Sequence, residues 1–269
     1  SRSLVQFGHR VENKRPISFE KNIERFVAVP MYARQMRKKI EQRLSNAAAD
    51  ADSCPQNRIE WADKSLGIIT SSIAYQYVKE VWPDASVLKL GLTFPFPDRL
   101  IRQFASQVAS VLVVEELDNF LEEHIRAIGV QCFGREFVPG IGELSISELQ
   151  KSRAKMENKP LPAEELPKYA SLLPARPPVL CPGCPHRGVF YALAKHDVVV
   201  TGDIGCYSLG SCKPLSRLDS ILCMGAGISM AHGLDKAGEK KKVVGIVGDS
   251  TFFHSGITGL LDIVYNKGK

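Results

Sequence analysis

The sequence predicts an α/β fold made of two parallel-sheet units. Short runs of β-branched and other apolar residues alternate with stretches of helical periodicity, first over residues 65–128 and again over 188–265. Alternation at this spacing is typical of parallel sheets that are covered by helices on both faces. A proline-rich stretch separates the two regions, so we expect two units rather than one continuous sheet.

The composition is that of a globular protein. The 269 residues are 44% hydrophobic and 24% charged, which excludes a disordered, collagen-like or coiled-coil chain. The net charge of +6 is not gathered into a basic stripe with interleaved aromatic residues, so we expect no nucleic-acid partner. Because no apolar run approaches the roughly 18 residues of a membrane helix and no signal-peptide core is visible, we expect no membrane insertion and a cytoplasmic location.

Residues 1–60 are expected to be the end of a preceding domain and a connector. Met31 to Leu44 has helical periodicity, whereas the stretch from Asn46 to Pro55 is expected to be a loop. The chain opens on Ser1 rather than methionine and stops after an apparent helix. We therefore interpret it as an internal fragment of a longer polypeptide.

Residues 61–150 are expected to form the first unit. Its predicted strands are the apolar runs 66–70, 86–92 and 110–114, and its predicted helices cover 73–81, 98–104 and 118–128. Glu115 and Glu116 follow the third run and therefore lie at the carboxyl end of a strand, where parallel sheets place ligands or interfaces. Surface carboxylates near a helix start are an equally good interpretation.

Residues 151–176 are expected to be a linker, because prolines at this density prevent regular structure. Residues 177–269 are expected to form the second unit. Its predicted strands are 198–201, 220–224 and 242–247, and its predicted helices cover 188–195, 228–236 and 257–265.

Two glycine-rich turns follow strands of the second unit. The first is Met224-Gly225-Ala226-Gly227 and the second is Val247-Gly248-Asp249-Ser250-Thr251. A glycine turn that leads from a strand into a helix exposes backbone N–H groups to an anion such as a diphosphate, and an aspartate there adds a hard oxygen ligand for Mg²⁺. The first turn alone is a weak signal, because glycines also serve close packing, and it does not complete the dinucleotide-binding fingerprint.

Five of the seven cysteines lie between Cys181 and Cys223. Cys181 and Cys184 form a C-x-x-C pair, which fits a zinc site, a redox pair or the ligation of a cluster. Cys206 follows 22 residues after Cys184, and Cys206 with Cys212 makes a poor second zinc pair. Plain thiols are expected at Cys54 and Cys132, and core packing is expected at Cys223.

The turn Gly248-Asp249-Ser250 resembles the Gly-Asp-Gly motif of thiamine diphosphate enzymes, with Ser250 in place of the last glycine. Together with Cys181-Pro182-Gly183-Cys184-Pro185-His186-Arg187 and Gly202-Asp203-Ile204-Gly205-Cys206, it resembles the 2-oxoacid:ferredoxin oxidoreductases. More narrowly, the chain resembles the alpha subunits of the indolepyruvate branch over nearly its whole length.

The resemblance implies what each region is. Residues 1–60 would be the end of a pyrimidine-binding domain and a connector, 61–150 would be a transketolase C-terminal-like domain, and 177–269 would be a truncated thiamine-diphosphate-binding domain. Asp249 would bind the Mg²⁺ that anchors the cofactor. The full set of cofactor-binding residues that the resemblance implies is Cys206, Gly225, Gly227, Gly248, Asp249, Ser250 and Thr251.

The resemblance also implies a [4Fe–4S] cluster held by Cys181, Cys184 and Cys206, with a fourth ligand at Cys212 or beyond residue 269. The second Mg²⁺ ligand and the activating glutamate would likewise lie outside this sequence.

The implied reaction is the oxidative decarboxylation of an aryl pyruvate, with coenzyme A taking the acyl group and ferredoxin the electrons. A beta subunit would be the protein partner, and the chain by itself would be inactive. The alternatives are a non-oxidative thiamine-dependent decarboxylase and a non-catalytic metal- or cluster-binding scaffold.

Overall fold

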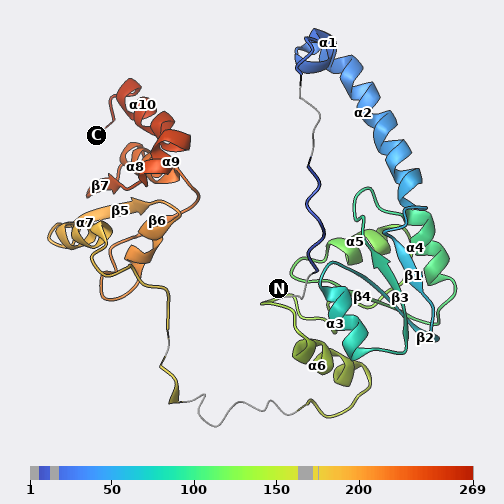
Figure 1. Ribbon diagram of the computed structural model, residues 1–269. Helices are drawn as coiled ribbons and strands as arrows, with labels where there is room; N and C mark the ends of the chain where they lie inside the picture. The colour runs from blue at the N-terminus through green and yellow to red at the C-terminus, as the bar shows by residue number, and fades with distance from the viewer. Residues whose placement is uncertain (1–5, 13–17, 163–171, 175, 269) are drawn as a thin grey trace. The chain divides into compact units, whose positions relative to one another are not determined.

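The structure is a computed structural model, and it describes residues 6–12, 18–162, 172–174 and 176–268. The chain forms two compact units, Ser1–Glu165 and Leu166–Lys269 (Figure 1). Both units have mixed α/β structure with parallel sheets, which confirms the predicted fold class. Each unit is described by itself below.

A long helix precedes the first sheet. Helix α1 spans Ile23–Phe26, and α2 spans Pro30–Ala51 with its proline in the first turn, where the missing N–H is not needed. The predicted loop at 46–55 is therefore wrong over its first half. Alanine has the highest helix propensity of all residues, so the alanine-rich stretch continues the helix to Ala51.

The sheet of the first unit has four strands in the order β1-β3-β2-β4. The strands are β1 Arg58–Glu60, β2 Asp63–Ser71, β3 Ala85–Leu90 and β4 Val111–Val114. β2 runs parallel to both β3 and β4, with Ile68 opposite Val87 and Leu112. β1, which the sequence did not predict, adds an antiparallel edge to β3.

Helices cover both faces of this sheet. They are α3 Ala74–Val81, α4 Asp98–Ala105, α5 Phe120–Ala127 and α6 Ile146–Met156. Successive strand residues point to opposite faces, so Ile68 packs with the core that includes residues of α3 and α6, whereas Ile69 packs with the core that includes residues of α4 and α5. Both side chains are fully buried, as expected for a doubly covered sheet.

The stretch predicted as a linker begins with regular structure. α6 starts at Ile146, where Ser145 caps it through the N–H of Glu148, and it continues to Met156. Leu149 of this helix is fully buried in the core of the first unit, so the first residues of the stretch 151–176 belong to that unit. Residues 163–171 and 175 lie outside the described part, as do 1–5 and 13–17 of the predicted connector.

The second unit has a smaller parallel sheet in the order β6-β5-β7. Its strands are β5 Val198–Gly202, β6 Ser220–Ile221 and β7 Lys242–Gly245. Its helices are α7 Pro185–Leu193, the 3-10 helix η2 Cys206–Ser211, α8 Ala226–Lys236, α9 Asp249–Thr251, the π-helix η3 Phe252–Gly256 and α10 Ile257–Tyr265. α8 packs on β5 and β7, and α10 packs on α8.

The expected strand 220–224 and the buried position of Cys223 are both wrong. β6 pairs with β5 only at Ser220 and Ile221, because β5 itself ends at Gly202 and offers no further backbone partner. The chain instead turns at Gly225 into α8, and Cys223 is exposed in that turn.

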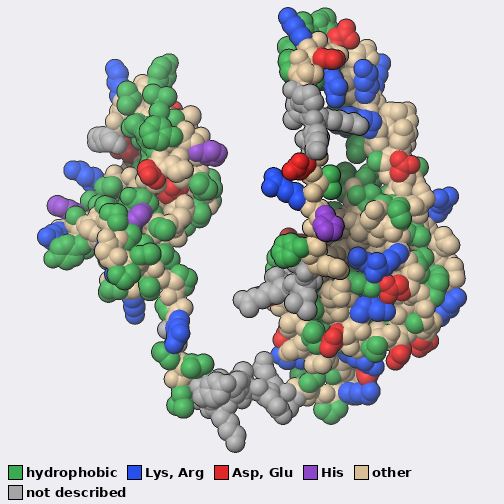
Figure 2. All heavy atoms as spheres, in the orientation of Figure 1, with side chains coloured by type: hydrophobic (Ala, Val, Ile, Leu, Met, Phe, Trp, Pro, Cys, Tyr) green, Lys and Arg blue, Asp and Glu red, His purple; other side chains and the backbone are tan. Residues whose placement is uncertain are grey.

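The α10 end of the second unit is apolar on its surface. In Figure 2, hydrophobic side chains cover much of the visible face of this unit. The side chains exposed by at least 60% include Phe253, Leu261, Val264 and Tyr265. Among the described residues, no helix is long and apolar enough to span a membrane.

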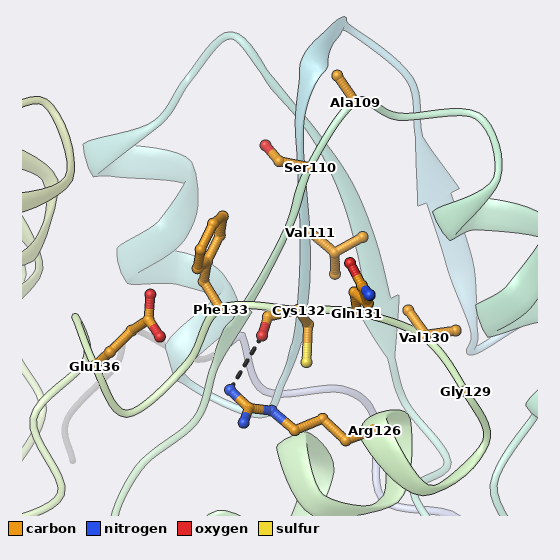
Figure 3. A pocket seen from close by; sticks show the side chains of 10 residues that line it. All are labelled: Ala109, Ser110, Val111, Arg126, Gly129, Val130, Gln131, Cys132, Phe133 and Glu136. Atoms are coloured by element: carbon orange, nitrogen blue, oxygen red, sulfur yellow. Dashed lines mark hydrogen bonds between the residues drawn. The ribbon is translucent and has the colours of Figure 1, made fainter.

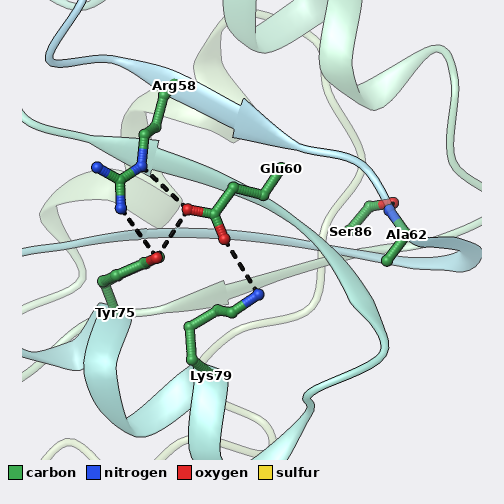
Figure 4. A network of polar contacts seen from close by, with 6 residues as sticks. All are labelled: Arg58, Glu60, Ala62, Tyr75, Lys79 and Ser86. Atoms are coloured by element: carbon green, nitrogen blue, oxygen red, sulfur yellow. Dashed lines mark hydrogen bonds and ion pairs between the residues drawn. The ribbon is translucent and has the colours of Figure 1, made fainter.

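A polar network ties β1 to α3 in the first unit (Figure 4). The Tyr75 hydroxyl donates to Glu60 Oε1 at 2.7 Å, and Arg58 and Lys79 each place a nitrogen 3.0 Å from the same carboxylate. The hydrogen bond from Tyr75 is the main cause that lowers the pKa of Glu60 from its ordinary 4.5 to about 2. The ionised carboxylate therefore stabilises the fold.

We predict that Glu60→Gln lowers the free energy of unfolding by about 1 kcal/mol at pH 7. Since the pKa of Glu60 is lowered in the folded state, the wild-type advantage is complete above pH 4.5 and disappears as the pH falls towards about 2. Urea unfolding at a series of pH values measures this difference. Glu80→Gln, at an exposed position of α3, is the control, and an equal effect of both substitutions would exclude a special role for the network.

Candidate functional site

Three turns meet at one end of the second sheet. Because β5, β6 and β7 are parallel, the segments that follow them leave from the same edge, which we call the carboxyl edge. Asp203 follows β5, the turn 222–225 follows β6, and the turn 246–248 follows β7. The structure thus brings together the two glycine-rich turns that the sequence singled out.

Asp203 connects the three turns. Its side-chain Oδ1 accepts a hydrogen bond from Gly225 N at 2.8 Å, and its Oδ2 accepts one from Gly248 N at 3.0 Å. The residue is 1% exposed. Sequence reasoning included Asp203 in a motif without giving it a role. The signal that could have identified it is a carboxylate directly after a buried strand, between two glycine-containing segments.

Glycines allow α8 to approach the sheet closely. Gly225 has a φ of +86°, which favours glycine, and directly precedes the helix. A Cβ on Gly227 would lie 2.5 Å from Ile246 O and 2.9 Å from Gly202 O. The Gly227 carbonyl also accepts a hydrogen bond of 2.6 Å from the buried Thr201 hydroxyl. The first turn of α8 is therefore locked onto β5 at the carboxyl edge.

Asp249 begins α9 at the same edge and is exposed. Its Oδ1 accepts a hydrogen bond of 2.7 Å from Ser250 N, whereas its Oδ2 has no hydrogen-bonding partner in the part of the chain that the structure describes. Thr251, the last residue of α9, is 4% exposed. An exposed carboxylate oxygen beside a glycine turn has the chemistry of a Mg²⁺ ligand.

The predicted cluster ligands lie in the same unit. Cys184 is the N-cap of α7, with its Sγ 3.0 Å from His186 Nδ1. Cys181 precedes it in the sequence and is exposed. Cys206 is exposed at the start of η2, and the half-buried Cys212 directly follows η2. No group of three or more His, Cys, Asp or Glu among the described residues is arranged to hold a metal ion. The cluster therefore stays a prediction.

The carboxylates after β4 in the first unit serve the fold. Glu115 is 9% exposed and accepts hydrogen bonds from the N–H groups of Leu121 and Glu122 at 2.7 and 2.9 Å. It thereby caps α5, while burial raises the pKa of its carboxyl group. Glu116 accepts a hydrogen bond from Leu144 N at 3.1 Å. Glu115 thus acts at a helix start, although it is buried and not the surface carboxylate of the alternative interpretation, and Glu116 binds the backbone just before α6.

A pocket of about 560 Å³ lies beside β4 in the first unit (Figure 3). The guanidinium of Arg126 donates to the Cys132 carbonyl at 3.1 Å, and burial raises the pKa of the Cys132 thiol. A thiol with a raised pKa is a poor nucleophile at neutral pH. The pocket therefore contains no activated cysteine, and the carboxyl edge of the second unit remains the better candidate.

Comparison with known families points to the same edge. Residues 203–269 match the family model described as "Thiamine pyrophosphate enzyme, C-terminal TPP binding domain". The matched region begins at Asp203 and includes both glycine-rich turns. No solved structure matches the chain significantly.

The chain is also similar to curated proteins named "Indolepyruvate oxidoreductase subunit IorA". The protein of Archaeoglobus fulgidus is 36% identical over 93% of this chain and 43% of its own length. The protein of Methanothermobacter marburgensis is 36% identical over 99% of this chain and 46% of its own length, and that of Pyrococcus abyssi is 35% identical over 95% and 45%. The chain thus spans somewhat less than half the length of these relatives.

We predict that Gly227→Ala lowers the free energy of unfolding of the second unit by about 1–3 kcal/mol, because the new methyl group would overlap two backbone carbonyl oxygens. Gly233→Ala in the same helix is the matched control, since nothing lies within 4 Å of its added Cβ. The control is expected to be stabilising by roughly 0.5–1 kcal/mol. Thermal unfolding of the two variants measures the contrast, and equal melting temperatures would contradict this packing.

Proposed function

We propose that the chain belongs with the indolepyruvate oxidoreductase IorA subunits that it resembles over 93% or more of its length. We further propose that its second unit supplies the Mg²⁺ and diphosphate half-site of a thiamine-diphosphate-dependent 2-oxoacid oxidoreductase. The observation that carries the proposal is the position of Asp249. It lies at the carboxyl edge, between a glycine turn and a helix start, inside the region that matches a thiamine pyrophosphate-binding domain.

The residues at this edge fit a magnesium diphosphate. Asp249 would ligate Mg²⁺ through its exposed carboxylate, and the ion would supply positive charge to a bound diphosphate. The first-turn amides of α8, Gly227 among them, together with the hydroxyl group of the exposed Ser250, would bind diphosphate oxygens. Thr251 is buried, so its hydroxyl would take part only if the edge opens around the cofactor. The amides of Gly225 and Gly248 already donate to Asp203, so these two glycines would shape the site rather than bind the phosphates.

When bound, thiamine diphosphate supplies the carbanion chemistry that removes CO₂ from a 2-oxoacid. The chain's own contribution is to bind and orient the cofactor's charged end. The first turn of α8 would present N–H groups and Asp249 one carboxylate, both at the edge of a sheet, and sites built on regular elements are held more accurately than sites on loops.

The name of the relatives supports the proposed substrate, whereas the proposed acceptors rest on the resemblance of the sequence motifs. We propose an aryl pyruvate of the indolepyruvate type as the 2-oxoacid, coenzyme A as the acyl acceptor and ferredoxin as the acceptor of two electrons. A beta subunit would complete the enzyme. Cys181, Cys184 and Cys206 stay candidates for a [4Fe–4S] cluster, and no step of the proposal depends on them.

We predict that Asp249→Ala in the full-length protein abolishes Mg²⁺-dependent binding of thiamine diphosphate. Removing the carboxylate deletes a ligand of the Mg²⁺ ion, and without the ion the negative charge of the diphosphate is no longer neutralised. Isothermal titration calorimetry with Mg²⁺ and thiamine diphosphate measures the loss.

The matched control is Asp197→Ala. Asp197 has a side chain that is 81% exposed and pairs with Lys241 just before β5, at the opposite end of the same sheet. The control is expected to bind like the wild type. Unchanged cofactor affinity in the Asp249 variant would refute the assignment of Asp249.

A further inference from the structure

Asp203 is a buried acidic residue at the carboxyl edge, and burying a carboxylate costs free energy. The carboxylate is 1% exposed, and no lysine, arginine or histidine pairs with it among the residues that the structure describes. Its two hydrogen-bonding partners are backbone N–H groups, those of Gly225 and Gly248. Burying a carboxylate without a cation is unfavourable unless hydrogen bonds satisfy it, and here the two backbone amides are what satisfies it.

The two hydrogen bonds of Asp203 set the distance between the two glycine turns. Gly225 directly precedes α8, and Gly248 directly precedes Asp249. Because one rigid carboxylate group binds both amides, it sets the spacing between the start of α8 and the start of α9. A diphosphate with its Mg²⁺ would have to contact both of these helix starts at once.

We propose that Asp203 is the positioning residue of this site, holding the two glycine turns at the separation that a magnesium diphosphate requires. The inference rests on the proposed function, because it concerns the same edge. Asp203 does not touch the cofactor in this account, since both of its oxygens are occupied by backbone amides. It acts through Gly225 on the helix start of α8 and through Gly248 on Asp249.

Substitution of Asp203 separates positioning from stability. Asp203→Asn keeps one acceptor oxygen but presents an NH₂ group to the second amide, and Asp203→Ala removes both acceptors. In the full-length protein we expect Asp203→Asn to weaken thiamine diphosphate binding in the presence of Mg²⁺ by roughly tenfold, and Asp203→Ala to weaken it further.

The matched control is Asp219→Asn. Asp219 accepts a hydrogen bond of 2.6 Å from Val200 N inside the same sheet, away from both glycine turns. Calorimetry yields the binding stoichiometry and the dissociation constant separately. A purely structural loss lowers the fraction of folded protein and therefore the apparent stoichiometry, but the folded molecules keep the wild-type dissociation constant. We expect the control to keep the wild-type dissociation constant. A positioning role raises the dissociation constant.

Amide hydrogen exchange of the wild type provides a second test, which holds even if the variants do not fold. Gly225 N and Gly248 N should be protected without cofactor and equally protected with Mg²⁺ and thiamine diphosphate. Rapid exchange of these amides without cofactor, or an Asp203→Asn variant with wild-type affinity, would overturn the role of Asp203. A wild type that binds no thiamine diphosphate would instead overturn the proposed function.

Discussion

The site at the carboxyl edge depends on the shared carboxylate of Asp203. It lies at the end of the central strand β5 and accepts hydrogen bonds from the turns that follow β6 and β7. Parallel strands bring these turns to one edge, but they do not determine how far apart the turns lie. The buried carboxylate does so, and α8 and Asp249 take their positions from it.

Each unit has a buried carboxylate that follows a strand and accepts two backbone hydrogen bonds, but the two carboxylates have different roles. In the first unit, Glu115 follows β4 and accepts two backbone hydrogen bonds from a single helix start, so it only caps α5. In the second unit, Asp203 divides its two oxygens between separate turns. The close contact of Gly227 with the backbone of Gly202 and Ile246 sets how near α8 lies to the sheet. The exposed carboxylate of Asp249 lies at the same edge of that sheet.

Much of this arrangement is encoded locally and could be predicted. The turn at Gly248 and Asp249 was predicted because a strand, a glycine and a helix start follow one another in the sequence. The role of Asp203 depends on partners 22 and 45 residues away, which no local pattern specifies. The length over which β6 pairs with β5 could not be predicted from a local pattern either. β6 stops at Ile221 because β5 ends, and Cys223 is therefore exposed rather than buried.

The most direct test of the account is an experimental structure of the full-length protein with Mg²⁺ and thiamine diphosphate bound. The account predicts an Asp249 carboxylate oxygen about 2.0–2.1 Å from the Mg²⁺ ion, with both Asp203 oxygens still accepting from Gly225 N and Gly248 N. A diphosphate bound away from this edge, or a Mg²⁺ ion without Asp249 among its ligands, would contradict the account.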